Sequence, residues 1–199
     1  MIEKAELIDL YTKKGYSVSV IAKRLGCSEH KVNYWMHKHG ISKRSISDAI
    51  YKKWNPRGDP FFVTRPKTLQ EAVLYGMGIG LYWGEGTKAN KMSVRLGNSD
   101  PALIKTFVSF LVKFYGINKH KLRFGLQIFG DMDADSALHH WENKLRVSRK
   151  QFYPKVIITP HRGVGNYRQK TKFGVLTVYF NNKKLRDIIC RAIDDESMR

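Results

Sequence analysis

The sequence predicts an α+β protein in which a small, all-helical N-terminal unit precedes a larger domain of helices and antiparallel strands. Residues 3–50 carry apolar side chains at helical spacing, interrupted by Gly15, Gly26 and Gly40. Residues 121–129 instead alternate between polar and apolar side chains, the pattern of a half-buried strand. Helical and strand patterns then follow one another to the end of the chain, which is typical of an α+β domain.

The chain is strongly basic, and its charge indicates a polyanionic partner. Its 199 residues include 36 Lys and Arg against 17 Asp and Glu, which gives a formal net charge of +19. The basic residues occur along the whole chain rather than in one tail. Nucleic acid is therefore the expected partner, and a basic surface that is merely solvated is the alternative.

The sequence contains no membrane or export signal that we can identify. No apolar run approaches the ~18 residues of a membrane span, and the segment from Met1 to Glu6 does not resemble a secretory signal. Cys27 and Cys190 are isolated, which argues against a disulfide framework or a zinc ribbon. We therefore expect no membrane partner and a reducing, cytoplasmic location.

Three helices are expected in the N-terminal unit. Residues 5–11 form an amphipathic first helix that Gly15 ends, and residues 18–25 form the second. Ser28 is a candidate N-cap for a third helix that continues to Lys38. The residues of this helix that we expect to contribute to the core are Val32, Trp35 and Met36.

The stretch from Val20 to Ser28, followed by Val32, resembles the helix-turn-helix of sigma factors and transposases, because an Ala, a turn Gly and a Val occupy helix-turn-helix spacing. The resemblance implies that the third helix contacts DNA, and a plain three-helix packing unit is the alternative. The DNA-binding residues expected in this unit are Ser28, His30, Lys31, Asn33, Tyr34, Lys38, Lys43 and Arg44.

The expected domain organisation is a helix-turn-helix domain at residues 1–50, a linker at 51–68 and a second domain at 69–199. The linker contains three prolines and a glycine with scattered charge. Its aromatic residues Trp54, Phe61 and Phe62 indicate that part of it docks on a domain.

The second domain is expected to alternate helices with short strands. Pro101 after Asp100 marks the start of one helix, because proline is favoured at the first helical position and aspartate caps helices. Helices are expected at residues 69–84, 101–114, 135–145 and 185–193, and strands at 93–96, 121–129, 156–159 and 175–180.

One face of the expected sheet is basic. Alternation places Lys121, Arg123 and Gln127 outward on one strand and Arg95 outward on another. Such side chains bind phosphates and read base edges, whereas a solvated sheet face is the alternative. The loop that follows adds Arg162, Arg168 and Lys170, with Lys155 and Lys172 nearby, as further expected phosphate contacts.

Small residues recur every fourth position along the helix at 69–84. Ala72, Gly76, Gly80 and Gly84 share one helical face. Because each glycine costs a helix interior about 1 kcal/mol, we expect compensation from close approach of a second helix. The row ends at Glu85, so that two helices packed on this face would bring two carboxylates together, which suits a divalent metal.

The segment from Gly78 to Gly86 resembles the LAGLIDADG motif of homing endonucleases. Gly80, Leu81, Glu85 and Gly86 match the motif, whereas Gly78 and Trp83 depart from it. The junction from Leu96 to Pro101, with the sequence Asn-Ser-Asp, is similar to one found in many bacterial members. The resemblance implies a saddle of antiparallel strands over double-stranded DNA and, since only one motif copy is present, a homodimer.

The resemblance also implies a function and a cofactor. It assigns Mg2+ or Mn2+ to Glu85 and a sequence-specific endonuclease activity to the dimer, with Lys172 or Lys121 as the basic residue that organises water. The Ala72, Gly76, Gly80 and Gly84 face would be the dimer interface. A non-catalytic transcriptional regulator is the main alternative, and an RNA-splicing maturase is a further one.

A second metal site deserves comparison. Asp131, Asp133, Asp135 and Glu142 have the spacing of a calcium-binding EF-hand loop. Position six is Ser136, where the sharp turn of such a loop needs glycine. A turn followed by a helix cap is therefore the preferred interpretation of this segment.

Overall fold

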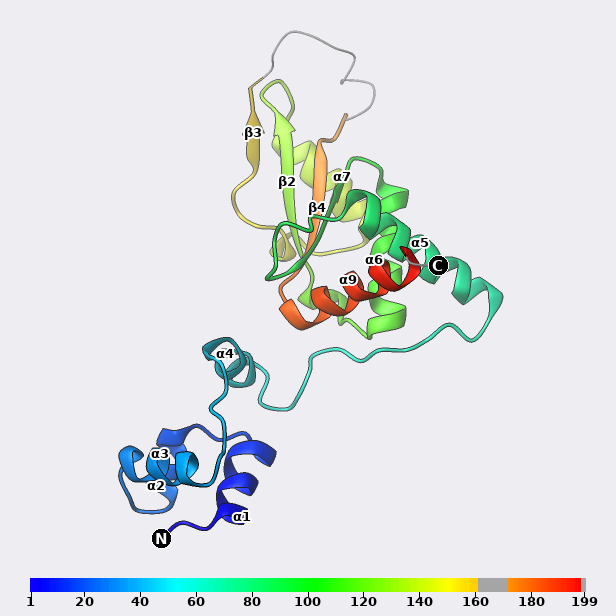
Figure 1. The fold of residues 1–199 in the computed structure, drawn as a ribbon. Coiled ribbons are helices and arrows are strands. Elements are labelled where there is room, and N and C mark those ends of the chain that lie inside the picture. Colours follow the sequence, from blue (N-terminus) through cyan, green and yellow to red (C-terminus); the bar gives the residue numbers. More distant parts are fainter. Residues whose placement is uncertain (161–171, 198–199) are drawn as a thin grey trace. The chain divides into compact units, whose positions relative to one another are not determined.

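The structure, a computed structural model, describes residues 1–160 and 172–197 (Figure 1). The chain divides into two compact units, Met1–Pro60 and Phe61–Arg199. The division falls inside the expected linker, and each unit has a hydrophobic core of its own. The architecture is mixed α and β, as the sequence predicts.

The first unit is the expected set of three helices with one addition. Its first helix continues from α-helical into π-helical geometry, and a fourth helix follows the third. The elements are α1 Lys4–Leu7, the π-helical η1 Ile8–Lys13, α2 Val18–Arg24, α3 Glu29–Lys38 and α4 Ile46–Trp54. Ser28 caps α3 as expected, because its hydroxyl accepts a hydrogen bond from the Lys31 amide at 3.2 Å.

The core of this unit lies between the first helix and the helix-turn-helix pair. Leu7, Ile21, Val32 and Met36 are fully buried. Trp35, which we expected in the core, is only partly buried; it packs against this core and also stacks on His39. The difference is one of helical phase, since Met36 lies one turn after Val32 and takes the inner position.

Helix α4 occupies part of the segment expected to be a linker. Ser45 begins it by accepting a hydrogen bond from the Asp48 amide at 3.0 Å. No residue of α4 is buried, and Trp54 is 76% exposed. Trp54 therefore does not dock within its own unit, whereas Phe61 does join a core, that of the second unit.

The second unit consists of a four-stranded sheet covered on one face by helices (Figure 1). Its helices are α5 Leu69–Glu85, α6 Pro101–Tyr115, α7 Ala134–Leu145 and α9 Lys183–Ser197, with short 3-10 turns η2 Lys119–Lys121 and η3 Arg149–Gln151. Its strands are β1 Val94–Asn98, β2 Arg123–Phe129, β3 Ile157–Thr159 and β4 Val175–Phe180.

The strand order is β1-β4-β2-β3, and the sheet is not wholly antiparallel. β4 pairs antiparallel with both β1 and β2, as expected, but β3 pairs parallel with β2. The cause is the connection between them: α7 crosses over between β2 and β3, and such a crossover returns the chain in the same direction. The edge strand β3 is three residues long and lies between Pro154 and Pro160.

The start of β2 also differs from expectation. Lys121 belongs to η2 rather than to the strand, which begins at Arg123. The Asn118 side chain starts this turn by accepting a hydrogen bond from the His120 amide at 2.9 Å. A local cap therefore prevails over the alternating pattern at the first residues of the expected strand.

Helix α6 and the inner sheet face form the core of this unit. Asp100 caps α6 and Gly116 ends it in the left-handed conformation. Its fully buried apolar residues include Ile104, Phe107, Phe110 and Phe114. The chain just before α5 runs beside the end of α6, where the Phe62 and Thr64 amides donate to the carbonyls of Tyr115 and Phe114 at 3.1 and 2.8 Å.

Candidate nucleic-acid interface

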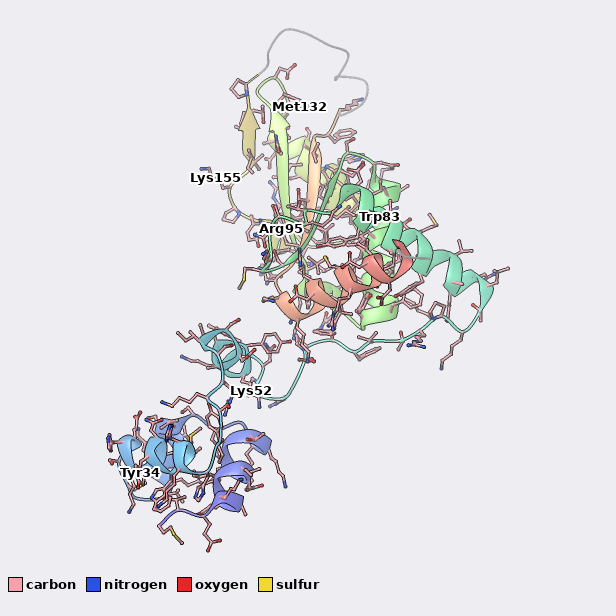
Figure 2. All side chains as sticks on the ribbon, in the orientation of Figure 1. Tyr34, Lys52, Trp83, Arg95, Met132 and Lys155 are labelled. Atoms are coloured by element: carbon pink, nitrogen blue, oxygen red, sulfur yellow. The ribbon has the colours of Figure 1, made fainter. Side chains whose placement is uncertain are left out.

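The exposed face of α3 carries most of the residues expected to contact DNA in the first unit. His30, Lys31, Tyr34 and Lys38 are all exposed, and Tyr34 can be followed in Figure 2. The Lys38 ammonium lies 4.9 Å from the centre of the Trp35 ring and 6.0 Å from that of Tyr34. These contacts combine positive charge with flat apolar surface on the face of the helix that is free of the core.

Asn33 is less open than these four residues, whereas Ser28 is exposed and precedes the helix as its N-cap. Asn33 is partly buried, and its Oδ1 has no hydrogen-bond partner among the described residues. The Ser28 hydroxyl is used as the N-cap. Ser28 therefore fixes where the helix begins, and its position places the first helical amides at the exposed end of α3.

Arg44 holds the first unit together. Its guanidinium donates hydrogen bonds to the carbonyls of Gly15, Tyr11 and Tyr16 at 2.6–2.8 Å and lies 4.0 Å from the centre of the Tyr11 ring. Its amide also donates to the Tyr11 hydroxyl. Because the terminal nitrogens of its guanidinium are engaged inside the fold, we remove Arg44 from the candidate interface. Its neighbour Lys43 is exposed and stays a candidate.

The outer face of the sheet in the second unit is built from rows of paired residues. Arg95, Tyr179 and Arg123 form one row across β1, β4 and β2, and Gly97, Thr177 and Gly125 form the next. The alternating residues of these strands, such as Leu96 and Val178, are buried on the helical side. This outer face is the candidate nucleic-acid interface of the second unit.

Arg95 is a cation of this face on the edge strand β1 (Figure 2). Its Nε donates to the Ser93 hydroxyl at 2.7 Å, and its guanidinium lies 5.1 Å from the centre of the Tyr179 ring. The Tyr153 ring meets that of Tyr179 edge-on at 5.2 Å. An arginine fixed beside two tyrosines offers charge for phosphates together with flat surfaces for bases or sugars.

Two of the other expected residues of this face are engaged with their neighbours. Arg123 donates to the carbonyls of His120 and Leu122, both at 2.9 Å. Gln127 donates to the Thr159 hydroxyl at 2.9 Å. Lys121 is exposed at the end of the sheet that also carries Arg95. Arg162, Arg168 and Lys170 lie outside the described residues.

Sequence reasoning missed the tyrosines of this face. Tyr179 and Thr177 could have been predicted, because the side chains of residues 175–180 alternate between the two faces of the sheet as those of the neighbouring strand do. Tyr153 had no comparable signal. It reaches the face because its amide donates to the Phe124 carbonyl at 2.8 Å, a contact between segments far apart in the chain.

The small-residue face of α5 is open in the single chain. Ala72, Gly76, Gly80 and Gly84 are exposed, and a Cβ added to any of these three glycines would meet nothing within 4 Å among the described residues. Large apolar residues flank them on the same side of the helix and are also exposed. These are Leu69, Val73, Met77 and Trp83, of which Trp83 is labelled in Figure 2.

The eight residues of this open face occupy one continuous arc of the helix, and none of them is polar. We refer to Leu69, Ala72, Val73, Gly76, Met77, Gly80, Trp83 and Gly84 as the α5 outer face. A contiguous exposed apolar surface of this kind marks an interaction site.

Glu85 lies at the C-terminal end of the α5 outer face. It is exposed, and the described residues give it no hydrogen bond or ion pair. The next residues attach this end of α5 to β1, because Gly86 bridges to Leu96 and the Thr87 amide donates to the Arg95 carbonyl at 2.9 Å. Glu85 is thereby held beside the end of the sheet that carries Arg95.

The remaining catalytic candidates do not gather around Glu85. Lys172 precedes the first residue of β4, whereas Arg95 pairs with Tyr179 near the last. The two ends of a six-residue strand lie roughly 17–20 Å apart, so Lys172 belongs to the far end of the sheet. Tyr82 lies in the last turn of α5, and burial raises the pKa of its phenol to about 12, so that the phenol stays neutral.

The acids with EF-hand spacing serve the fold, in agreement with the preferred interpretation. Asp133 caps α7 by accepting a hydrogen bond from the Ser136 amide at 2.7 Å, and hydrogen bonding to the Ser136 hydroxyl, together with this amide, lowers the pKa of Asp133. Asp135 and Glu142 pair with Arg149. Within residues 1–160 and 172–197, no three His, Cys, Asp or Glu side chains are grouped as metal ligands.

No helix within the described part of the chain combines the length and the apolar character that crossing a membrane requires. No curated protein and no solved structure matches the chain. Residues 1–40 do match a family model, that of the homeodomain-like domain. The match covers α1, η1, α2 and α3, and it supports a helix-turn-helix DNA-binding unit at this end of the chain.

Proposed function

We propose that the protein is a homodimeric, sequence-specific DNA endonuclease that requires a divalent metal. One observation carries the proposal: the α5 outer face is apolar, open and contiguous, and it ends at the exposed carboxylate of Glu85, which has no partner among the described residues. The LAGLIDADG-like sequence of the same segment supports it. The helix-turn-helix domain supplies a first DNA contact, and the outer face of the sheet supplies the second.

A second copy of the chain is the occupant that the α5 outer face favours. Glycines along a helix permit close backbone approach only by a surface that is itself smooth, and two copies of this face satisfy that condition reciprocally. Packing the faces together removes Leu69, Val73, Met77 and Trp83 from water. The dimer would also offset the helical cost of three glycines, about 1 kcal/mol each.

In the dimer, two Glu85 carboxylates would come from two copies of one helix end. Their fit to a metal rests on donor chemistry, because Glu85 is exposed and unpaired and carboxylate oxygens are ligands that Mg2+ accepts. A bound Mg2+ would lower the pKa of water and stabilise charge on a phosphate. The chain's own part is to place Glu85 beside Arg95, which can bind the same DNA backbone.

A non-catalytic regulator is the second candidate, and one observation favours it. Lys172 lies at the far end of β4, so that within one chain Lys121 is the only one of the two expected basic residues near the Glu85 end of the sheet. If Lys121 does not reach Glu85 in the dimer, neither candidate residue organises water there, and the protein would bind DNA without cutting it.

The test combines selection with cleavage. The full-length protein is first used to select a binding sequence from a randomised duplex library, and the selected duplex is then incubated with Mg2+ or Mn2+. Wild type should cut it, Glu85→Gln should bind equally well without cutting, and Asp195→Asn, which removes another exposed acid, should cut normally. Tight binding without any nicking in either metal would establish the regulator instead.

A further inference from the structure

A basic pocket lies between α6 and α7, on the helical layer rather than on the outer face of the sheet. It has a volume of about 300 Å3 and is lined by Lys105, Val108, Ser109, Lys119, Lys144, Leu145 and Arg146. Four of these seven residues are cationic and none is acidic. A concave site with one sign of charge concentrates the opposite charge, so that this pocket is suited to an anion.

Three of the four cations are available to a ligand. Lys119 donates to the Leu145 and Arg146 carbonyls at 2.6 and 3.3 Å, and so it offsets the partial negative charge where α7 ends. The side chains of Lys105, Lys144 and Arg146 form no hydrogen bond or ion pair with the part of the chain that the structure describes. The Ser109 hydroxyl adds a neutral donor beside them.

Arg146 has an unusual backbone conformation. Its φ of 50° and ψ of 58° are left-handed, and among residues 1–160 and 172–197 it is the one non-glycine residue with positive φ. Glycine takes the left-handed conformation at or just after the ends of α2, α3 and α6, at Gly26, Gly40 and Gly116. Glycine at this position would relieve the backbone strain, yet the residue is an arginine that lines a basic pocket. The strain therefore points to a function of the Arg146 side chain.

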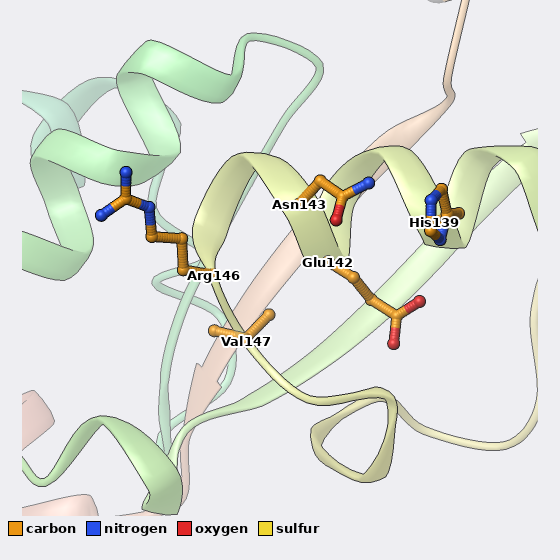
Figure 3. A pocket seen from close by; sticks show the side chains of 5 residues that line it. All are labelled: His139, Glu142, Asn143, Arg146 and Val147. Carbon is orange, nitrogen blue, oxygen red and sulfur yellow. The ribbon is translucent and has the colours of Figure 1, made fainter.

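Arg146 also lines a neighbouring pocket of about 460 Å3 with His139, Glu142, Asn143 and Val147 (Figure 3). Figure 3 shows the Arg146 side chain extending away from the Glu142 carboxylate. Glu142 pairs with Arg149, which reduces its effect on an anion nearby. Arg146 therefore lines both pockets, and its guanidinium contributes positive charge to the basic one.

We infer that the basic pocket binds a backbone phosphate of duplex DNA, as a contact separate from the outer face of the sheet. No aromatic side chain lines the pocket, so that nothing in it would hold a base. A phosphate whose nucleosides remain outside is the group that fits. The assignment of DNA as the source rests on the proposed function, and the pocket makes the protein bind DNA on two sides of the second unit.

The decisive variant is Arg146→Gly in the full-length protein. If Arg146 binds a phosphate, its replacement by glycine should weaken binding to a 40-bp duplex roughly tenfold at 0.1 M salt. It should also reduce the steepness of the plot of log affinity against log salt, the salt slope, by about one. The same variant should raise the melting temperature, because glycine adopts the left-handed conformation without strain. Lys144→Gln should lower the slope equally with no such rise.

Matched controls separate this inference from the proposed function. Arg191→Gln removes one exposed charge from α9 and should leave the slope unchanged, whereas Arg95→Gln should lower it through the outer face of the sheet. A slope for Arg146→Gly equal to that of Arg191→Gln would overturn the pocket while leaving the proposed function intact. If Arg146→Gly reduces the salt slope and Arg95→Gln leaves it unchanged, the pocket is retained and the sheet interface is overturned.

Two further outcomes bear on the source of the phosphate and on the role of Arg146. If inorganic phosphate raises the melting temperature of wild type but not of Lys144→Gln, while neither pocket variant changes the DNA slope, the pocket binds a phosphate other than that of DNA and the inference is wrong. A lower melting temperature for Arg146→Gly would make the arginine a structural residue and would also count against it.

Discussion

Gly78 and Phe110 meet where α5 packs on α6, and a Cβ on Gly78 would lie only 2.1 Å from the Phe110 Cγ. By contrast, four small residues of the same helix are exposed on the α5 outer face, namely Ala72, Gly76, Gly80 and Gly84. The same helix thus uses glycine for two purposes, internal close packing at Gly78 and an exposed smooth surface at Gly76, Gly80 and Gly84.

Gly78→Ala should destabilise the second unit by about 1–3 kcal/mol, because Phe110 is fully buried and has no room to move. Gly80→Ala adds the same methyl group to an open position and should leave unfolding of the monomer unchanged or improve it by up to about 1 kcal/mol. Urea unfolding at low protein concentration checks both, and equal effects of the two variants would contradict this packing.

Gly80→Leu should convert the dimer into a monomer, because a large side chain in the α5 outer face would hold two helix backbones apart. Val112→Leu, on an exposed position of α6, is the matched control and should leave the dimer intact. Light scattering distinguishes the two masses. A Gly80→Leu protein that stays dimeric would show that the chains associate elsewhere.

Arg44→Lys should loosen the first unit although it keeps the charge. A lysine cannot reproduce the planar fork that reaches the carbonyls of Gly15, Tyr11 and Tyr16, and we expect a loss of about 2–3 kcal/mol. Lys43→Gln, one residue earlier, should instead leave thermal unfolding unchanged and reduce the salt dependence of DNA binding. The opposite pattern would return Arg44 to the DNA interface.

The second unit should lose stability as the pH falls below about 6.5. His140 stacks on Phe173 at 3.7 Å, and burial, assisted by Lys144 and Lys172, lowers the pKa of its imidazole. A folded-state pKa below the unfolded value near 6.5 means that the unfolded chain binds the proton more readily, so protonation favours unfolding.

The check is thermal unfolding of wild type and His140→Gln between pH 7.5 and 5. The variant lacks the imidazole and should lose less stability over this interval than wild type does. Identical pH profiles would mean that His140 binds its proton equally well in the folded and the unfolded chain.

Features encoded locally were predictable from the sequence. Ser28 and Asp100 cap their helices because a short polar side chain bonds amides only two or three residues away. The buried face of β2 followed from its alternation, and the glycine face of α5 from helical spacing. Each of these signals is complete within a few residues of the chain.

Features that depend on distant contacts were not predictable. The role of Arg44 depends on carbonyls about thirty residues away, and Tyr153 reaches the sheet through Phe124. The parallel pairing of β3 follows from the crossover through α7, which no residue of β3 encodes. The homeodomain-like match supports the helix-turn-helix, whereas the dimer, the metal and the nuclease activity stay predictions.

The two edges of the sheet have a consequence for how the protein behaves when it is abundant. An open strand edge recruits other strands and leads to aggregates. Here the β3 edge is only three residues long and lies between two prolines, and the β1 edge is partly covered by Gly86 and Thr87. Growth of the sheet by addition of strands is therefore disfavoured at either edge.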